Sequence, residues 1–200
     1  MRLSELLIAT LLVVVSSDSS AAVTDPNSFG EALTSVSRSP DISPEDDLYA
    51  PLVGSWEVDT LDRKDDGTFV RGHGEWLFSR SLEGRAFQDV WIMPKRNPDG
   101  TRPNNVYNRY GTTVRMMNPK TRKWQITWFN PVSGDFDTLY ARKEGSNIVQ
   151  EGTRPSGQRV RWIFDQIEKN GFHWYGEAEQ PDGSWRREVE FTGTRRTGTR

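Results

Sequence analysis

The sequence predicts an all-β protein whose antiparallel strands follow one another in up-and-down order and close into a barrel. From Trp56 onward, short alternating or aromatic-rich runs succeed one another, as in antiparallel sheets. Turn residues separate these runs, most often a polar residue followed by glycine, which tolerates a positive φ. No apolar pattern of helical period and useful length competes with the strands. These observations indicate a barrel of about ten strands.

The strands succeed one another with short connections. Up-and-down order leaves two exposed edges unless the sheet closes, and closure removes the risk of aggregation at a bare edge. A barrel of about eight strands can already hold one small ligand, so a barrel of about ten should have at least that much room. The expected strands are 56–61, 69–78, 86–93, 106–117, 124–130, 136–142, 148–153, 159–166, 172–178 and 185–193.

The 8 tryptophans indicate which face of each strand points inward. Successive residues of a strand point to opposite faces. Burial of apolar surface contributes roughly 25 cal/mol per Å², so the rows that carry tryptophan should face the interior and the more polar rows should face solvent. The predicted inward rows are Gly74, Trp76 and Phe78; Phe87, Asp89, Trp91 and Met93; Trp124, Ile126 and Trp128; Val160, Trp162 and Phe164; Phe172, Trp174, Gly176 and Ala178; and Trp185, Arg187, Val189 and Phe191.

The run Gly54-Ser55-Trp56 resembles the Gly-x-Trp of the first strand of lipocalins and other calycins. In lipocalins an arginine late in the last strand packs on that tryptophan and closes the barrel. Arg195 or Arg196 stands in the matching place here. An arginine over a tryptophan ring contributes roughly 0.5–2 kcal/mol, so the pairing is physically reasonable.

Residues 50–196 as a whole resemble a calycin-like (lipocalin-like) family of bacterial domains of unknown function. The resemblance implies a calycin/lipocalin-like barrel and no settled activity. Lipocalin relatives bind small apolar molecules, and a few calycin-like barrels are isomerases or hydratases. Another branch binds haem through a histidine in the C-terminal half, but His173 lies in a polar row, and we expect no cofactor. The motifs that carry the resemblance are Gly54-Ser55-Trp56, Glu83-Gly84-Arg85, Tyr110-Gly111, Asn118-Pro119-Lys120, Trp124, Phe129, Phe172-His173-Trp174, Asp182-Gly183-Ser184-Trp185 and Arg195-Arg196.

Residues 1–22 have the pattern of a secretory signal peptide, with Arg2, an apolar run and the small residues Ser20-Ala21-Ala22. An uncleaved membrane anchor and a disordered N-terminus are the alternatives. Residues 23–49 are predicted to be a polar linker with one short helical turn near 29–33. The barrel domain should cover 50–196, followed by a tail at 197–200. The protein is therefore expected to be secreted or periplasmic.

The composition excludes several classes of partner. The chain has no cysteine and a formal net charge of -2, so it offers no disulfide framework and no electrostatic footprint for nucleic acid or an anionic membrane. Its two histidines, His73 and His173, could form a zinc site only if a carboxylate such as Glu75 or Glu177 converged with them. We favour two surface histidines and expect no metal. The protein should be a monomer or a homodimer.

The tryptophans of the inward rows also suit a pocket for flat apolar ligands, although each could simply fill the core. Asp89 and Arg187 are charged residues in inward rows, and a buried charge is costly unless it is paired. The two side chains could face each other across the barrel or each grip a polar group of a ligand, but we favour a structural ion pair, or a strand rim where both reach water. The predicted ligand-binding residues are Trp76, Asp89, Trp91, Trp128, Tyr140, Trp162, Trp174 and Arg187.

The leading functional hypothesis is binding of a small apolar or aromatic molecule. The first alternative is a cofactor-free isomerase, lyase or hydratase in which Asp89 is the acid–base group and Arg187 stabilises an oxyanion. The second is a non-catalytic interaction module, which predicts a solid interior with no void large enough for a ligand.

Overall fold

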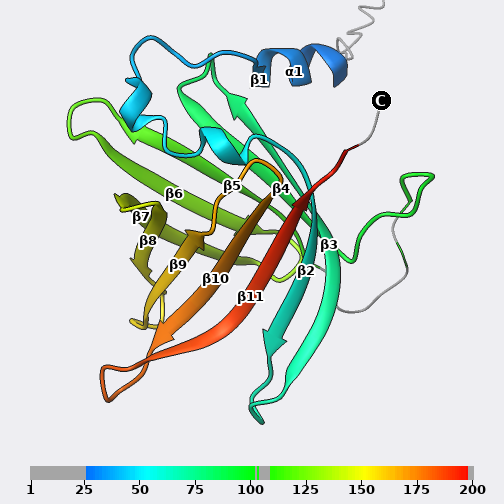
Figure 1. The fold of residues 1–200 in the computed structure, drawn as a ribbon, viewed down its shortest axis with the longest axis vertical. Helices are drawn as coiled ribbons and strands as arrows, with labels where there is room; N and C mark the ends of the chain where they lie inside the picture. Colours follow the sequence, from blue (N-terminus) through cyan, green and yellow to red (C-terminus); the bar gives the residue numbers. More distant parts are fainter. Residues whose placement is uncertain (1–25, 102, 104–108, 198–200) are drawn as a thin grey trace, which may run out of the picture.

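The computed structural model describes residues 26–101, 103 and 109–197, and it consists mainly of ten long antiparallel strands wrapped into a barrel (Figure 1). The strands are β2 (Gly54–Arg63), β3 (Phe69–Ser81), β4 (Ala86–Met93), β5 (Arg109–Asn118), β6 (Lys123–Asn130), β7 (Asp135–Glu144), β8 (Asn147–Thr153), β9 (Arg159–Asp165), β10 (Gly171–Glu179) and β11 (Trp185–Arg195).

The sheet closes because its last strand pairs with its first. Each strand from β2 to β10 is hydrogen-bonded to the next one along the chain, and β11 returns to pair antiparallel with β2. The predicted fold class, an up-and-down antiparallel barrel, is confirmed. All ten expected strands are present, and residues 106–108 of the expected fourth strand lie outside the described residues.

A short helix, α1 (Pro26–Leu33), and a two-residue strand, β1 (Thr34–Ser35), precede the barrel. The helix confirms the expected helical turn near residues 29–33. The small strand was not expected, and it pairs with the end of β3. Within the described ranges, no helix has the length and apolar character needed to cross a bilayer.

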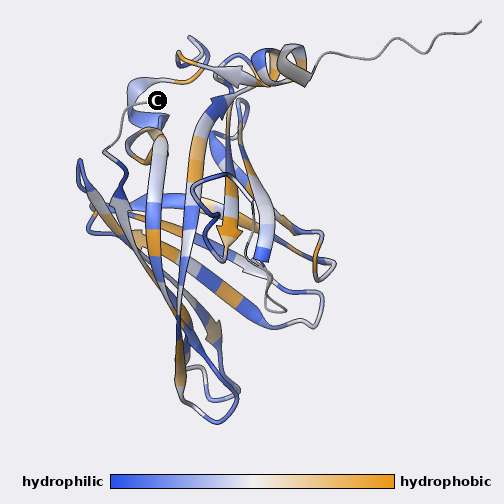
Figure 2. Cartoon of the chain, turned by 90° about the vertical axis from the view of Figure 1, so that its right-hand side faces the viewer, coloured by the Kyte–Doolittle hydropathy of each residue, from blue (hydrophilic) through white to orange (hydrophobic). Residues whose placement is uncertain are grey.

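Hydrophobic and hydrophilic residues alternate along the strands, as a two-faced sheet requires (Figure 2). The predicted inward rows are correct for β3, β4, β6, β9 and β10, where Phe78, Phe87, Ile126, Phe164 and Phe172 belong to one buried cluster.

The predicted inward row of β11 is wrong at its beginning. Gly176 of β10 stands opposite Val189, but Glu177 stands opposite Arg187, so Glu188 is an extra residue in β11. Such a bulge reverses the alternation beyond it. Trp185 and Arg187 consequently face outward, whereas Val189 and Phe191 keep the predicted inward direction.

The segment before β2 closes one end of the barrel, across the top in Figure 1. It contains two short 3₁₀ helices, η1 (Pro44–Asp46) and η2 (Ala50–Leu52). Ile42, Tyr49 and Leu52 are buried in the same cluster as the strand residues. The prediction of a polar linker as far as residue 49 is therefore wrong for its second half. Within the predicted linker, the buried residues Ile42 and Tyr49 are separated by six residues. This spacing is too sparse a pattern to predict that the segment packs on the barrel.

Candidate ligand-binding cavity

A cavity of about 160 Å³ lies inside the barrel. Its lining includes all five tryptophans that the sequence predicted as pocket wall, although they come from five different strands. This void contradicts the solid interior expected of an interaction module. The lining residues are Trp76, Trp91, Arg109, Thr113, Arg115, Trp128, Arg154, Trp162, Trp174, Val189 and Phe191.

The aromatic wall is held by ring contacts between strands that are distant in the chain. The ring of Phe191 stacks between Trp91 and Trp174, at centroid distances of 4.7 and 4.5 Å. Trp76 meets the edges of both tryptophans, at 5.5 and 5.9 Å. Trp162 extends the cluster through Trp174, at 5.9 Å. Such offset and edge-on pairs are the favoured aromatic geometries, so the rings fix one another's orientation.

Gly111 of β5 makes room for one wall of the cavity. A β-carbon at this position would lie 2.5 Å from the ring of Trp128 and 2.2 Å from the carbonyl oxygen of Phe129. Both distances are below van der Waals contact, and a backbone carbonyl cannot move aside. Any larger residue would therefore displace the Trp128 ring, so the glycine and the tryptophan form a single unit of the wall.

A buried ion pair lies at the inner side of the cavity. The Nη1 of Arg115 donates to Asp89 Oδ2 at 2.5 Å, and the backbone N–H of Thr113 donates to Asp89 Oδ1 at 3.0 Å. Both charged residues are 1% exposed. The guanidinium also lies 5.0 Å from the ring of Tyr49 and 5.2 Å from that of Phe78. The carboxylate thus has a fixed partner and serves to hold Arg115 in the wall.

The predicted pair between Asp89 and Arg187 is wrong. Arg115 lies on β5, which neighbours Asp89 on β4, whereas the bulge in β11 turns Arg187 outward. There its guanidinium lies 3.7 Å from the centroid of the Tyr175 ring and pairs with Glu177 and Glu190. The arrangement that the enzyme hypothesis required, with these two residues on opposite sides of one substrate, does not form.

Tyr140 is also outside the cavity. It lies on β7 between the buried residues Leu139 and Ala141, and 53% of its surface is exposed. The alternation of the strand places its hydroxyl on the outer face. Of the eight predicted ligand-binding residues, the structure brings together the five tryptophans in the wall and Asp89 behind it.

Two further arginines line the cavity, each paired with an acidic side chain. Arg109 donates to Asp62 Oδ2 at 2.7 Å. Arg154 donates to Glu188 Oε2 at 2.9 Å, and Glu188 is the extra residue of the β11 bulge. Desolvation raises the pKa of nearby Asp137, against the opposing effect of Arg154. The bulge thus contributes to the site by turning Glu188 toward Arg154.

The arginines and Thr113 were not expected from the sequence. In β5 the inward residues Thr113 and Arg115 are the polar row, and the outward residues Tyr110 and Met116 are exposed. An alternation rule therefore assigns this strand the wrong way round. The one usable signal was Asp89, because a charge expected in an inward row requires a cationic partner.

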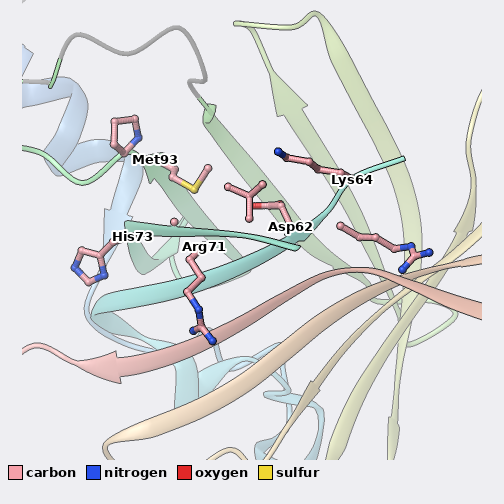
Figure 3. Close-up of a pocket in the computed structure, with 9 residues that line it drawn as sticks. Asp62, Lys64, Arg71, His73 and Met93 are labelled. Atoms are coloured by element: carbon pink, nitrogen blue, oxygen red, sulfur yellow. The ribbon is translucent and has the colours of Figure 1, made fainter. Parts of the chain in front are cut away.

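A second cavity, of about 380 Å³, adjoins the β2–β3 hairpin. Asp62 and Met93 lie on one side of β3, whereas Arg71 and His73 point to the other (Figure 3). Arg109, which lines the first cavity, contacts Asp62 and Met93. Its Nη2 lies 2.7 Å from Asp62 Oδ2 and 3.2 Å from Met93 Sδ. Arg109 thus lines the first cavity and contacts two residues that line the second.

The two histidines have separate acidic partners. The Nδ1 of His73 lies 2.8 Å from Asp59 Oδ1, and that of His173 lies 2.7 Å from Asp165 Oδ1. They stand on β3 and β10, with β2 and β11 between them. In the part of the chain that the structure describes, no three histidine or acidic residues are placed to hold a metal ion.

Comparisons with known proteins show similarity in fold. No protein-family model matches the chain, and no curated protein matches it by sequence. The solved structure of Rv2717c from M. tuberculosis is similar, with a TM-score of 0.52 and 13% identity over 78% of this chain and 99% of that one. The S-type phycobiliprotein lyase CPES from Guillardia theta has a TM-score of 0.51 and 8% identity, over 80% of this chain and 96% of that one. The chain therefore has a calycin-like barrel fold.

Proposed function

We propose that this protein binds a small, flat, largely apolar or aromatic molecule inside its barrel. The observation that carries the proposal is the internal cavity walled by five tryptophans and Phe191. Ligand sites are typically concave and apolar, with a few placed polar groups. This cavity has that composition, since Thr113 and three arginines interrupt an otherwise aromatic wall.

The volume of the cavity limits the size of the ligand. At about 160 Å³, it is comparable to engineered cavities of about 150 Å³ that bind benzene. Sites for drug-sized molecules are larger, at roughly 300–1,000 Å³. The structure therefore favours a ligand with a single aromatic ring. A larger ligand would need Arg109 to move and the second cavity to join the first.

We also propose membership of the calycin-like family of bacterial domains that the sequence resembles. The support is the pairing of Arg195 with the Gly-x-Trp motif: its guanidinium lies 4.0 Å from the Trp56 ring and donates to the carbonyl oxygens of Pro51 and Val53. The fold likeness to a protein named as a lyase agrees with a barrel that receives small molecules.

Export is a further part of the proposal. It is supported by the sequence of residues 1–22, with Arg2, an apolar run and small residues at a suitable cleavage position. The mass of the protein purified from its own source tests it. A mass that lacks about the first 22 residues supports export, whereas the full-length mass contradicts it.

Binding is tested with nitrobenzene, a flat uncharged molecule that quenches tryptophan fluorescence. We expect saturable quenching in the full chain. Val189→Phe should weaken binding at least tenfold, because the larger side chain fills a cavity that Val189 lines. Thr192→Phe is the matched control, since Thr192 is exposed on the same strand. Linear, non-saturable quenching that Val189→Phe leaves unchanged would contradict the proposal.

A further inference from the structure

The charged side chains in the cavity wall all have the same sign. Arg109, Arg115 and Arg154 line the cavity, and none of its lining residues within the described chain is an aspartate or a glutamate. Their acidic partners, Asp62, Asp89 and Glu188, are not lining residues of this cavity. The polar groups of the lining are therefore three guanidinium groups and the Thr113 hydroxyl, set among aromatic rings.

Two of the donors in this wall have no acceptor. Among the described residues, Trp76 Nε1 and Arg115 Nε are buried and make no hydrogen bond. Both side chains are well buried, since Trp76 is 5% and Arg115 1% exposed. Phe78 lies between them, 4.9 Å from the Trp76 ring and 5.2 Å from the Arg115 guanidinium. The two side chains thus both line the cavity and both contact Phe78.

Buried N–H groups without an acceptor are uncommon in native proteins, and each calls for a missing partner. The wall offers donors and no carboxylate, so the missing partner has to bring acceptor oxygens. An ionised acceptor makes shorter and stronger hydrogen bonds to arginine than a neutral one. The ion pairs of Arg109 and Arg154 place their positive members in the same lining and leave their carboxylates out of it, which favours an anion further because electrostatic attraction is weakly screened in a buried site.

We propose that the ligand is a small aromatic carboxylate, with its ring among the tryptophans and its carboxylate against the side formed by Trp76 and Arg115. This inference rests on the proposed binding function and specifies the ligand class. The carboxylate accepts hydrogen bonds from Trp76 Nε1 and Arg115 Nε. The pair between Arg115 and Asp89 stays in place, because the ligand uses the donor that this pair leaves over.

Benzoate and nitrobenzene provide the test, because they share one planar shape and differ in charge. Binding to the full chain is measured by calorimetry and by tryptophan quenching near neutral pH. We expect benzoate to bind at least about tenfold more tightly than nitrobenzene, as charged hydrogen bonds to two donors require. Benzamide, which has one neutral carbonyl acceptor, should lie between them.

Two conservative variants locate the carboxylate. Trp76→Phe keeps an aromatic ring and removes the indole N–H, and Arg115→Lys keeps the charge opposite Asp89 and removes the Nε donor. Each should weaken benzoate at least about fivefold more than it weakens nitrobenzene. Trp174→Phe is the matched control, because it trims a ring of the same wall and should affect both compounds alike. Unfolding curves of the variants confirm that each is folded.

The outcomes separate the two proposals. Saturable nitrobenzene binding with benzoate no tighter would overturn the carboxylate and leave the binding function intact. Equal losses for both compounds in Trp76→Phe and Arg115→Lys would also overturn it, because the donors would then act only by packing. Failure of all three compounds to bind would contradict the binding function and the carboxylate together.

Discussion

The two ends of the barrel interior are built from the same kinds of residue, but one end is packed and the other keeps a cavity. At the closed end, Trp56 Nε1 donates to the carbonyl oxygen of Leu52 at 2.8 Å, and Trp124 Nε1 donates to that of Asp46 at 2.9 Å. Tyr49 donates its hydroxyl hydrogen to Gln150 Oε1 at 3.0 Å. The segment before β2 thus supplies both apolar filling and acceptors. In the cavity, the donors Trp76 Nε1 and Arg115 Nε have no such acceptor among the described residues.

The difference shows that an aromatic row is core or pocket according to what covers it. Indole rings point inward at both ends, but among the residues that the structure describes only one end receives a segment of the chain. Burial at that end is complete enough to raise the pKa of Tyr49 well above its usual range, against the opposing effect of Arg115. The open end keeps a void and donors without partners, which are properties of a binding site.

The largest expected contrast concerns one tryptophan from each end. Trp56→Ala should cost about 3–5 kcal/mol of unfolding free energy, because it leaves a large hole in a fully packed region. Trp162→Ala should cost about 1–2 kcal/mol, since its ring is half-buried beside an existing cavity. Denaturant unfolding measures both. Equal losses would remove the distinction between a packed end and a pocket.

The buried ion pair between Asp89 and Arg115 should contribute nearly as much to the free energy of unfolding. Asp89→Asn leaves the buried Arg115 without its anionic partner and should cost about 3–5 kcal/mol. Asp65→Asn, in the exposed β2–β3 turn, should be nearly neutral and serves as the control. A loss below about 1 kcal/mol for Asp89→Asn would mean that the pair is not a structural element of the wall.

The closed end can be loosened from outside by removing its arginine. Arg195→Met loses the ring contact with Trp56 and the hydrogen bonds to Pro51, Val53 and Lys169, so we expect a loss of about 1–3 kcal/mol. The adjacent Arg196→Met removes an ion pair with Glu75, which keeps its other partner Arg96, so this change should cost less than about 1 kcal/mol. Thermal unfolding that ranks the two variants in the reverse order would count against the closure role of Arg195.

The smallest effect is expected at the open end, from Asp137. Desolvation raises the pKa of its carboxyl in the folded protein, and Asp135 and Glu188 raise it further while Arg154 opposes them. Folding therefore favours the protonated form, so stability should fall as the pH rises from the ordinary aspartate pKa of about 4 through the raised value. Asp137→Asn should remove this fall and be slightly more stable at pH 7.

The check is the unfolding free energy between acid and neutral pH for the wild type, Asp137→Asn and the exposed control Asp65→Asn. Parallel curves for all three proteins would show that Asp137 is not desolvated. A difference that grows toward neutral pH supports the assignment of this residue to the edge of the binding site.

Several features of the site follow directly from sequence pattern. Trp76, Trp91, Trp128, Trp162 and Trp174 could be assigned to one interior because strand alternation is a local property and tryptophan burial is strongly favourable. The partner of Asp89 could not be assigned, because it depends on which strands are neighbours. β5 adjoins β4, and its inward row is the polar one, so Arg115 took the place that the sequence suggested for Arg187.

The bulge in β11 is a second feature that could not be predicted without knowing how neighbouring strands pair. Glu188 looks like any other member of an alternating strand, and its effect appears only when β10 and β11 are paired. One unpaired residue reverses the row, which turns Arg187 out and brings Glu188 to Arg154. No local pattern in the sequence distinguishes this strand from a regular one.

The sequence by itself determined that this chain forms a closed antiparallel barrel with tryptophans inside, because strand alternation and turn preference depend on residues that are neighbours in the chain. The tertiary structure alone decided which end of that interior is filled and which is left open. It did so by laying the segment before β2 across one end, and by pairing each buried charge with a residue from a neighbouring strand. Those contacts join residues far apart in the chain, so their energies exist only once the barrel has closed.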